Sequence, residues 1–210
     1  TIKKNRLMIL FPTLLLELEM ADRKQINSEG VDLVIANNVV AHVPDINDFI
    51  DGISYILKQN AFASIEFPHV LNLINKNQFD TIYHEHYSYL SLRVIQRISE
   101  KYGLKVVDVE ELNTHGGSLR VWLKKEASPK ISVSVIEVLK KEDDAKLENI
   151  STYKNFQVSA QNTKFEFIEF LLKCKREGKS VMGYEAAAKG NTLLNFSGIG
   201  NDLIEFVADK

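Results

Sequence analysis

The apolar run over residues 31–37 constrains the fold more than any other feature of the chain. Short runs of this kind are typical of strands buried on both faces of a parallel sheet. A helix is predicted next, beginning near Asp45, whose side chain can cap free amides, and carrying apolar residues at helical spacing up to Leu57. A second strand is predicted over residues 62–67, before Pro68, which cannot donate to a ladder. Strand, helix and strand predict a right-handed parallel crossover, and so an α/β fold.

The next part of the chain predicts an antiparallel pair added to this mostly parallel sheet. Residues 92–102 have a helical pattern that ends at Gly103. Residues 104–109 and 119–123 then alternate like strands on either side of the turn 114–117.

Residues 132–176 have a helical pattern and are expected to form bridging helices. Within them, the charged run 140–144 is expected to be solvated, and Phe165, Ile168 and Leu172 are predicted to share one face. Gly178 is a natural stop for the last helix. Beyond it, a strand over 180–184, small residues and a helix predict the start of a second unit, and residues 204–207 read as a further strand.

Composition and charge exclude several classes of protein. With 26 Lys and Arg against 28 Asp and Glu, the net charge of −2 provides no positive field for nucleic acid. The single cysteine, Cys174, allows neither an internal disulfide nor a multi-cysteine zinc site, which favours a reducing cytoplasm.

The first residues have the basic-then-apolar order of a secretory signal, over residues 3–16. Acidic Glu17 and Glu19 follow where small cleavage-site residues would be needed, and Pro12 interrupts the apolar part. A membrane span takes about 20 apolar residues, so we expect a buried strand or helix edge and no membrane association. Because the chain starts at Thr1 rather than Met, we also expect it to be a fragment.

All the histidines lie in the middle of the chain, at positions 42, 69, 84, 86 and 115. Ligands of open parallel sheets bind beyond the carboxyl ends of the strands, where Asn37, Asn38, His42 and His69 are expected. The alternative is that each histidine is an ordinary surface or core residue.

The densest polar cluster, residues 79–90, contains Tyr83, His84, Glu85 and His86. Imidazole can accept a proton from a carbon next to a carbonyl, a nearby glutamate can orient the ring, and a tyrosine can donate to a developing enolate oxygen.

A metal site is the rival hypothesis for these residues, with His84, His86, His69 and Glu66 as ligands. Serine at position 88 breaks the zincin spacing, so we predict no metal.

Two turns have features suited to an anion, and each has a simpler alternative. Residues 114–120 combine His115, glycines and Arg120, which suits an anionic ligand, although for this segment alone a plain hairpin turn is the preferred explanation. Residues 183–191 resemble a phosphate-binding turn at a helix start, but they match neither the dinucleotide fingerprint nor the P-loop.

Taken together, these segments resemble a known family, the S-adenosylmethionine-dependent C-methyltransferases of nucleotide-linked keto-deoxysugars. The resemblance runs in order through residues 32–45, 66–69, 79–91, 114–120 and 183–195. It implies a partial Rossmann-like methyltransferase domain over 1–130, bridging helices over 131–177 and the start of a truncated α/β nucleotide-fold domain over 178–210.

The resemblance also implies roles for particular residues. His86 would remove the proton next to the fourth-position ketone, supported by Glu85 and Tyr83, and the resulting carbanion or enolate would attack the sulfonium methyl group. The substrate-binding residues would be Asn38, His42, His84, His115, Arg120, Lys189 and Asn191. The residues at the cofactor would be Ala36, Asn37 and Asn38.

The sequence departs from this family at several points. The N-terminal zinc module and the glycine-rich cofactor loop are missing, since only Gly30 precedes Asp32, so zinc is expected only in the missing module. Glu185 stands where the family usually has glycine. Two alternatives stay open: a nucleotide-sugar-binding module without catalysis, and a methyltransferase with another small acceptor. A small-molecule substrate is the expected partner, with no obligate protein partner.

Overall fold

The computed structural model describes residues 7–9 and 30–209. The expectations for residues 10–19, including Pro12, Glu17 and Glu19, lie outside the described residues. The chain forms two compact units: the first contains the described residues up to Leu73 together with His86–Glu148, and the second contains Ile74–Glu85 and the chain from Asn149 onward. The domain boundaries expected at residues 130 and 177 are not the boundaries of these compact units, and they stay a prediction.

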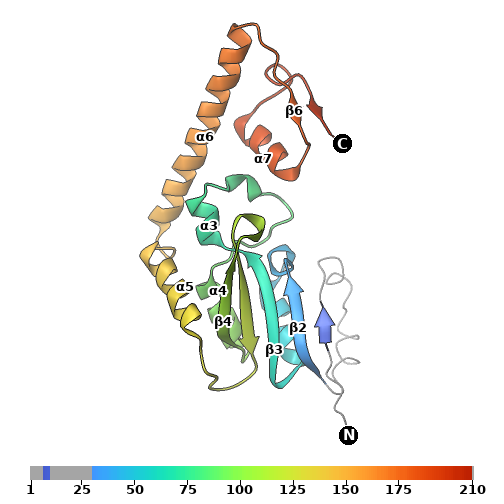
Figure 1. Ribbon diagram of the computed structural model, residues 1–210, viewed down its shortest axis with the longest axis vertical. Coiled ribbons are helices and arrows are strands. Elements are labelled where there is room, and N and C mark those ends of the chain that lie inside the picture. Colours follow the sequence, from blue (N-terminus) through green and yellow to red (C-terminus); the bar gives the residue numbers. More distant parts are fainter. Residues whose placement is uncertain (1–6, 10–29, 210) are drawn as a thin grey trace. The chain divides into compact units, whose positions relative to one another are not determined.

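The first unit is built on a mixed five-stranded sheet with the order β1-β2-β3-β5-β4 (Figure 1). Its strands are β1 (Leu7–Ile9), β2 (Val31–Asn37), β3 (Leu57–Pro68), β4 (Lys105–Leu112) and β5 (Ser118–Lys124). β1, β2 and β3 are parallel, whereas β5 is antiparallel to both β3 and β4. The parallel crossover and the late antiparallel pair are therefore confirmed.

Residues Leu7–Ile9 form a strand, one of the two expected forms, but its predicted burial holds only for Met8, which packs against the core. Leu7 is 57% exposed and Ile9 is 45% exposed. Pairing with β2 satisfies the backbone of this short strand through hydrogen bonds, which does not require its side chains to leave solvent.

Helices α2 (Ile46–Ile56), α4 (Leu92–Lys101) and α5 (Val133–Asp144) pack in the first unit. α2 contacts β3, α4 contacts β4 and β5, and α5 contacts both β4 and α4; Figure 1 shows α4 behind the sheet. Asp45 accepts hydrogen bonds from the amides of Asn47 and Asp48, as the sequence predicts for the cap of α2. Leu57, assigned to this helix by its spacing, instead begins β3.

Alternation along the strands decides which side chains enter the core. On β5, Leu119, Val121 and Leu123 are fully buried, while Arg120 and Trp122 between them are only half-buried. Neighbouring residues of a strand point to opposite faces of the sheet. β5 thus turns three apolar side chains to one face of the sheet, and Arg120 and Trp122 to the other.

The prediction of a solvated run over residues 140–144 is confirmed for Lys140, Lys141, Asp143 and Asp144 but is wrong for Glu142. Glu142 is buried, with 2% of its surface exposed, on the face of α5 that also buries Val135 and Val138. The spacing 135, 138, 142 places these three side chains on one side of a helix. Helix geometry therefore overrides the charged composition of this stretch.

The second unit contains the long helix α6 (Ile150–Arg176), η2 (Phe79–Thr81), α7 (Ala188–Ser197) and two short parallel strands, β6 (Gly183–Tyr184) and β7 (Val207–Ala208). The ring of Phe79 lies 5.2 Å from that of Phe196, and Asn77 Nδ2 donates to Thr163 Oγ1 at 2.9 Å. These contacts join η2 to α7 and residue 77 to α6.

Several boundaries in the second unit differ from the prediction. The expected strands over 180–184 and 204–207 are shortened or shifted to β6 and β7. On α6, Phe165 and Leu172 are exposed, while Ala160 and Leu171 are buried. Helical spacing predicts the helix correctly, but the elements that pack against α6 decide which of its side chains are buried.

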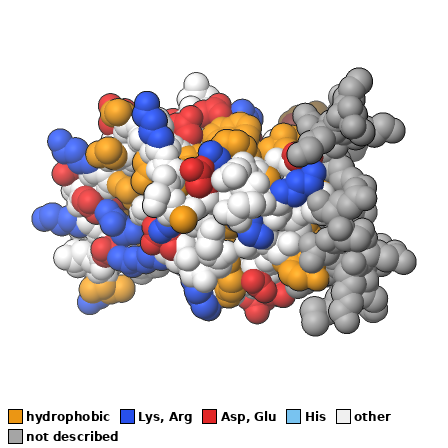
Figure 2. Space-filling view, turned by 90° about the horizontal axis from the view of Figure 1, so that it is seen from below, with side chains coloured by type: hydrophobic (Ala, Val, Ile, Leu, Met, Phe, Trp, Pro, Cys, Tyr) orange, Lys and Arg blue, Asp and Glu red, His pale blue; other side chains and the backbone are white. Residues whose placement is uncertain are grey.

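No helix in the described part of the chain is long and apolar enough to cross a membrane. On the face seen in Figure 2, Lys and Arg side chains are interspersed with Asp and Glu. The described residues on this face therefore form no extended patch of one sign.

Asp108 anchors α5 to β4 and gives the first prediction. The pKa of Asp108 is lowered mainly by the Ser134 hydroxyl, which donates to Oδ1 at 2.6 Å, against a smaller opposing effect of burial. A lowered carboxyl pKa stabilises the fold above the unfolded-state pKa of about 3.9, and this contribution is lost as the pH falls through the folded-state pKa. Ser134→Ala is therefore expected to lower stability at pH 6 and to lose this effect progressively in acid.

Urea unfolding followed by the fluorescence of Trp122, the single tryptophan of the chain, measures this effect in the first unit. The exposed Ser128 provides the matched control, Ser128→Ala. A loss of stability in Ser134→Ala that is the same at pH 3 and pH 6 would contradict the role of Asp108.

Candidate active site

The candidate site begins where the parallel strands β2 and β3 end. Past Asn37 the chain turns sharply at Asn38, which has a φ of 55°, a left-handed conformation that asparagine tolerates better than most residues. The Asn38 amide donates to the Glu66 carbonyl at 2.8 Å, and the short helix η1 (Val40–His42) follows. Asn38 and His42 are thereby placed at the sheet edge where α/β proteins bind ligands.

His86 lies beside His42 in the first unit. The centroids of the two rings are 4.8 Å apart, and the ring of Tyr89 approaches His86 edge-on at 6.1 Å. The amides of Tyr87 and Ser88 both donate to the Ala41 carbonyl, at 2.8 and 3.3 Å. The backbone after His86 is thus fastened to η1, which brings together two histidines far apart in the sequence.

His115 joins the same group from the turn between β4 and β5. It lies in η3 (Thr114–Gly116) with a φ of 50°, and its Nε2 is 3.4 Å from Asn38 Nδ2. Asn38 Oδ1 is buried and has no hydrogen-bond partner within the described part of the chain. The first unit therefore contains Asn38, His42, His86 and His115 of the predicted site, and a buried amide oxygen that can accept a hydrogen bond from a ligand.

Arg120 is held by carboxylates on both neighbouring strands. The register pairs it with Glu66 on β3 and Glu110 on β4, and its guanidinium lies 3.0 Å and 3.4 Å from their oxygens. Glu66 also accepts from the Thr114 hydroxyl at 3.3 Å. Opposite charges facing one another across strands stabilise the pairing, so binding of an anion by Arg120 would have to compete with two carboxylates.

Tyr83, His84 and Glu85 lie in the second unit, whose boundary with the first falls between Glu85 and His86. The rings of Tyr83 and His84 are 6.3 Å apart. Burial raises the pKa of Tyr83, and the negative charges of Glu85 and Asp80 raise it further. The phenol therefore keeps its proton at neutral pH and can donate a hydrogen bond.

Lys189 and Asn191 lie in the first turn of α7. Asn191 donates to the Ala186 carbonyl at 3.2 Å, and Lys189 is exposed. Glu185, just before them, has a φ of 70°, a conformation that glycine adopts without strain. This backbone angle accounts physically for a preference for glycine at that position.

Two family comparisons match consecutive parts of the sequence. Residues 15–109 match the family described as methyltransferase domain, and residues 113–210 match the C-methyltransferase C-terminal domain. The chain belongs to the C-methyltransferases. The α/β sheet of the first unit is accordingly the Rossmann-like sheet of a methyltransferase, as the resemblance implied.

A curated relative agrees with this family. The chain is 35% identical over 178 residues to the C-methyltransferase NovU of Streptomyces niveus, a match that covers 84% of this chain. The match spans 42% of the length of that relative.

Solved methyltransferase structures are also similar to part of the chain. One is the magnesium protoporphyrin IX methyltransferase of Synechocystis, with a TM-score of 0.37, 15% identity, and coverage of 46% of this chain and 45% of that one. Another is a SAM-dependent methyltransferase of Methanosarcina mazei, with a TM-score of 0.37, 14% identity, and coverage of 47% and 61%.

The described residues include groups that could bind part of S-adenosylmethionine, the cofactor that the family implies. Ala36 buries its side chain completely, so it can offer only its backbone, while Asn37 is exposed at the strand end. The unpartnered oxygen of Asn38 supplies an acceptor for a hydroxyl or ammonium group at the same edge. The segment between β1 and β2 lies outside the described residues.

The rival hypothesis is a metal site, which needs several ligand side chains close together. Within residues 7–9 and 30–209, no three side chains of His, Cys, Asp or Glu gather in a way that could hold a metal ion. His69 instead makes a hydrogen bond to Glu142, at 2.8 Å.

Sequence reasoning missed the partners of two buried carboxylates. Sequence patterns do not reveal the partner of Glu66, because its place opposite Arg120 follows only once the register of β3 and β5 is known. Glu142 was assigned to solvent, although its spacing from Val135 and Val138 would have placed it on the buried face. Periodicity within α5 was therefore an available signal, whereas strand register was not.

The electrostatic effect of Glu85 on Tyr83 gives the second prediction. Glu85→Gln removes a negative charge that disfavours the phenolate, so the pKa of Tyr83 is expected to fall. Alkaline ultraviolet titration of each protein, minus that of the same protein carrying Tyr83→Phe, isolates this one tyrosine among the seven. Glu169→Gln, an exposed change on α6, is the control, and an equal Tyr83 pKa in both variants would refute the effect.

Proposed function

We propose that this chain carries part of the active site of an S-adenosylmethionine-dependent C-methyltransferase. Its substrate would be a nucleotide-linked 4-keto-deoxysugar, methylated at the carbon next to the ketone. The similarity to the C-methyltransferase NovU supports the reaction class. The observation that carries the proposal is the pairing of His42 and His86, 4.8 Å apart, beyond the carboxyl ends of the parallel strands.

His86 is the proposed base. Its imidazole takes the proton from the carbon next to the ketone, the C–H bond breaks, and the electron pair is delocalised into an enolate with negative charge on the ketone oxygen. S-adenosylmethionine, when bound, would supply an electrophilic methyl group for the carbon, and its sulfur would leave with the bonding electrons as a neutral thioether. The hydrogen bonds to Ala41 fix the backbone beside His86, and a fixed base loses less entropy in reaching the reactive geometry.

Hydrogen-bond donors would stabilise the charge that develops on the ketone oxygen. Tyr83 keeps its phenolic proton, since burial and neighbouring carboxylates raise its pKa. Asn38 Nδ2 is a second donor, near His115. Donors fixed in place before the reaction contribute more than solvent can. In this assignment Glu85 supports the protonated form of His86, and His42 contacts the sugar.

The nucleotide part of the substrate would be bound by His84, Arg120, Lys189 and Asn191. Lys189 lies in the first turn of α7, where free backbone amides and a positive dipole end favour a diphosphate.

The third prediction tests the base in the full-length gene product. His86→Asn is expected to lower kcat for methyl transfer by about 10²- to 10⁴-fold, the usual contribution of a general base. Exchange of deuterium from solvent into the carbon next to the ketone should fall with it. Binding of S-adenosylmethionine, measured by calorimetry, should not change.

Tyr87→Phe is the matched control, since Tyr87 is exposed and adjacent to His86. An unchanged rate in His86→Asn shows that another group is the base. If the full-length wild type binds the nucleotide sugar but does not bind S-adenosylmethionine, the protein is a non-catalytic binding module. Methylation of a different small molecule identifies another acceptor.

A further inference from the structure

The chain leaves the first unit after Leu73 and returns to it at His86. The two sides of this excursion are joined within the first unit. His69 and Leu90 form an isolated parallel bridge, and the Val70 amide donates to the Leu90 carbonyl at 3.0 Å. His86, the proposed base, is therefore the first residue after the chain re-enters the first unit, four residues before Leu90 of this bridge.

Glu142 of α5 occupies the N-terminus of α4, directly after this bridge. Its Oε1 accepts from the Leu92 amide at 2.5 Å, and its Oε2 accepts from the Arg93 amide at 3.0 Å. The third amide of α4, that of Val94, is capped by Ser91. A carboxylate at this position satisfies amides that have no partner within the helix, and it complements the positive end of the helix dipole.

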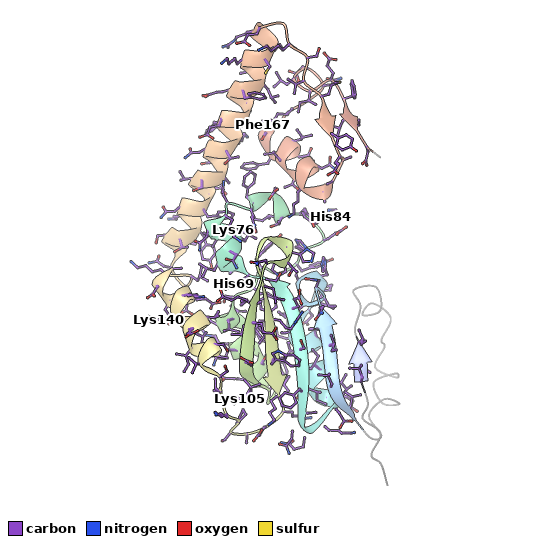
Figure 3. The ribbon with its side chains drawn as sticks, in the orientation of Figure 1. His69, Lys76, His84, Lys105, Lys140 and Phe167 are labelled. Atoms are coloured by element: carbon purple, nitrogen blue, oxygen red, sulfur yellow. The ribbon has the colours of Figure 1, made fainter. Side chains whose placement is uncertain are left out.

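His69 completes the arrangement from the other side of the excursion. Its Nε2 donates to Glu142 Oε1 at 2.8 Å, and the two side chains are 1% and 2% exposed. Its backbone amide donates to the Gly117 carbonyl at 3.0 Å, in the turn that carries His115. Figure 3 shows His69 at the end of the sheet where β3 runs into α3 (Val70–Asn75).

We propose that the buried His69–Glu142 pair is a clamp that positions His86. The Glu142 carboxylate binds His69, which precedes the segment in the second unit, and the amides of Leu92 and Arg93, which follow it. The backbone around Leu90, which connects His86 to α4, is therefore held in place. The hydrogen bonds to Ala41 fix the backbone beside His86. His69 and Glu142 are positioning residues in this inference, which rests on the proposed function of His86.

An exposed ion pair in the same region provides a contrast. Arg97 of α4 pairs with Glu148, which follows α5, but their side chains are 63% and 59% exposed. Exposed pairs contribute little, because solvent screens them and they lose side-chain entropy, whereas a buried group left without a partner is costly. The clamp and this pair link the same parts of the chain, and only the clamp is expected to matter for His86.

The fourth prediction compares two substitutions of His69 in the full-length gene product. His69→Gln keeps an amide donor at the position of Nε2, and His69→Leu removes it. We expect His69→Leu to lower kcat by about 10- to 100-fold with KM nearly unchanged, because a misplaced base slows the reaction more than it weakens binding. His69→Gln should restore kcat to within about threefold of the wild type.

A second measurement uses Glu142→Gln and is independent of activity. Glutamine presents a donor to amides or to His69, so one of the three hydrogen bonds is lost. Hydrogen–deuterium exchange over residues 86–95 should become about tenfold or more faster, with exchange in β5 unchanged. Glu148→Gln is the matched control and should leave both kcat and exchange at wild-type values.

The outcomes separate this inference from the proposed function. A wild type that methylates no keto-sugar refutes the function, while the exchange measurement still tests the clamp. Wild-type exchange in Glu142→Gln, or equal kcat in His69→Leu and His69→Gln, overturns the clamp. If His69→Leu or Glu142→Gln unfolds the first unit, as reported by Trp122, the pair serves folding as a whole and the positioning role is likewise rejected.

Discussion

The parallel pairing of β2 with β3 is the interaction on which the rest of the site depends. Its register places Asn37 opposite Glu66, and the ladder continues one step further through the amide of Asn38. Because the two strands end at the same edge, the turn after β2 and the residues after β3 meet there. Backbone hydrogen bonds thus determine where His42 and His69 lie, before any contact between side chains is considered.

Two buried carboxylates organise what surrounds this edge, each in a different way. Glu66 faces Arg120 across the ladder and holds the turn that carries His115 through Thr114. Glu142 holds the start of α4 and His69. Both carboxylates are almost fully enclosed and both have several donors, which is the condition under which a buried polar group stabilises a structure.

The proposed chemistry needs a base and a hydrogen-bond donor. His86 is the proposed base, and the backbone beside it is fastened to η1. Tyr83 is the proposed donor, since its raised pKa suits it to donate a hydrogen bond rather than to lose its proton. A base that accepts a proton and a phenol that keeps one are the two properties required to form and stabilise an enolate.

The sequence by itself determined the order and type of β2, α2, β3, α4, β4 and β5, because apolar periodicity, Asp45 and Gly103 act over a few residues. It also located the histidine-rich segment and its family. The tertiary structure decided which side chains meet: His42 with His86, Arg120 with two carboxylates, and Glu142 with His69. These contacts join residues 44 to 73 positions apart, or depend on strand register, and local pattern carries no information about either. The charged composition around Glu142 predicts exposure, yet this side chain is buried, because burial depends on which elements pack against that face of α5.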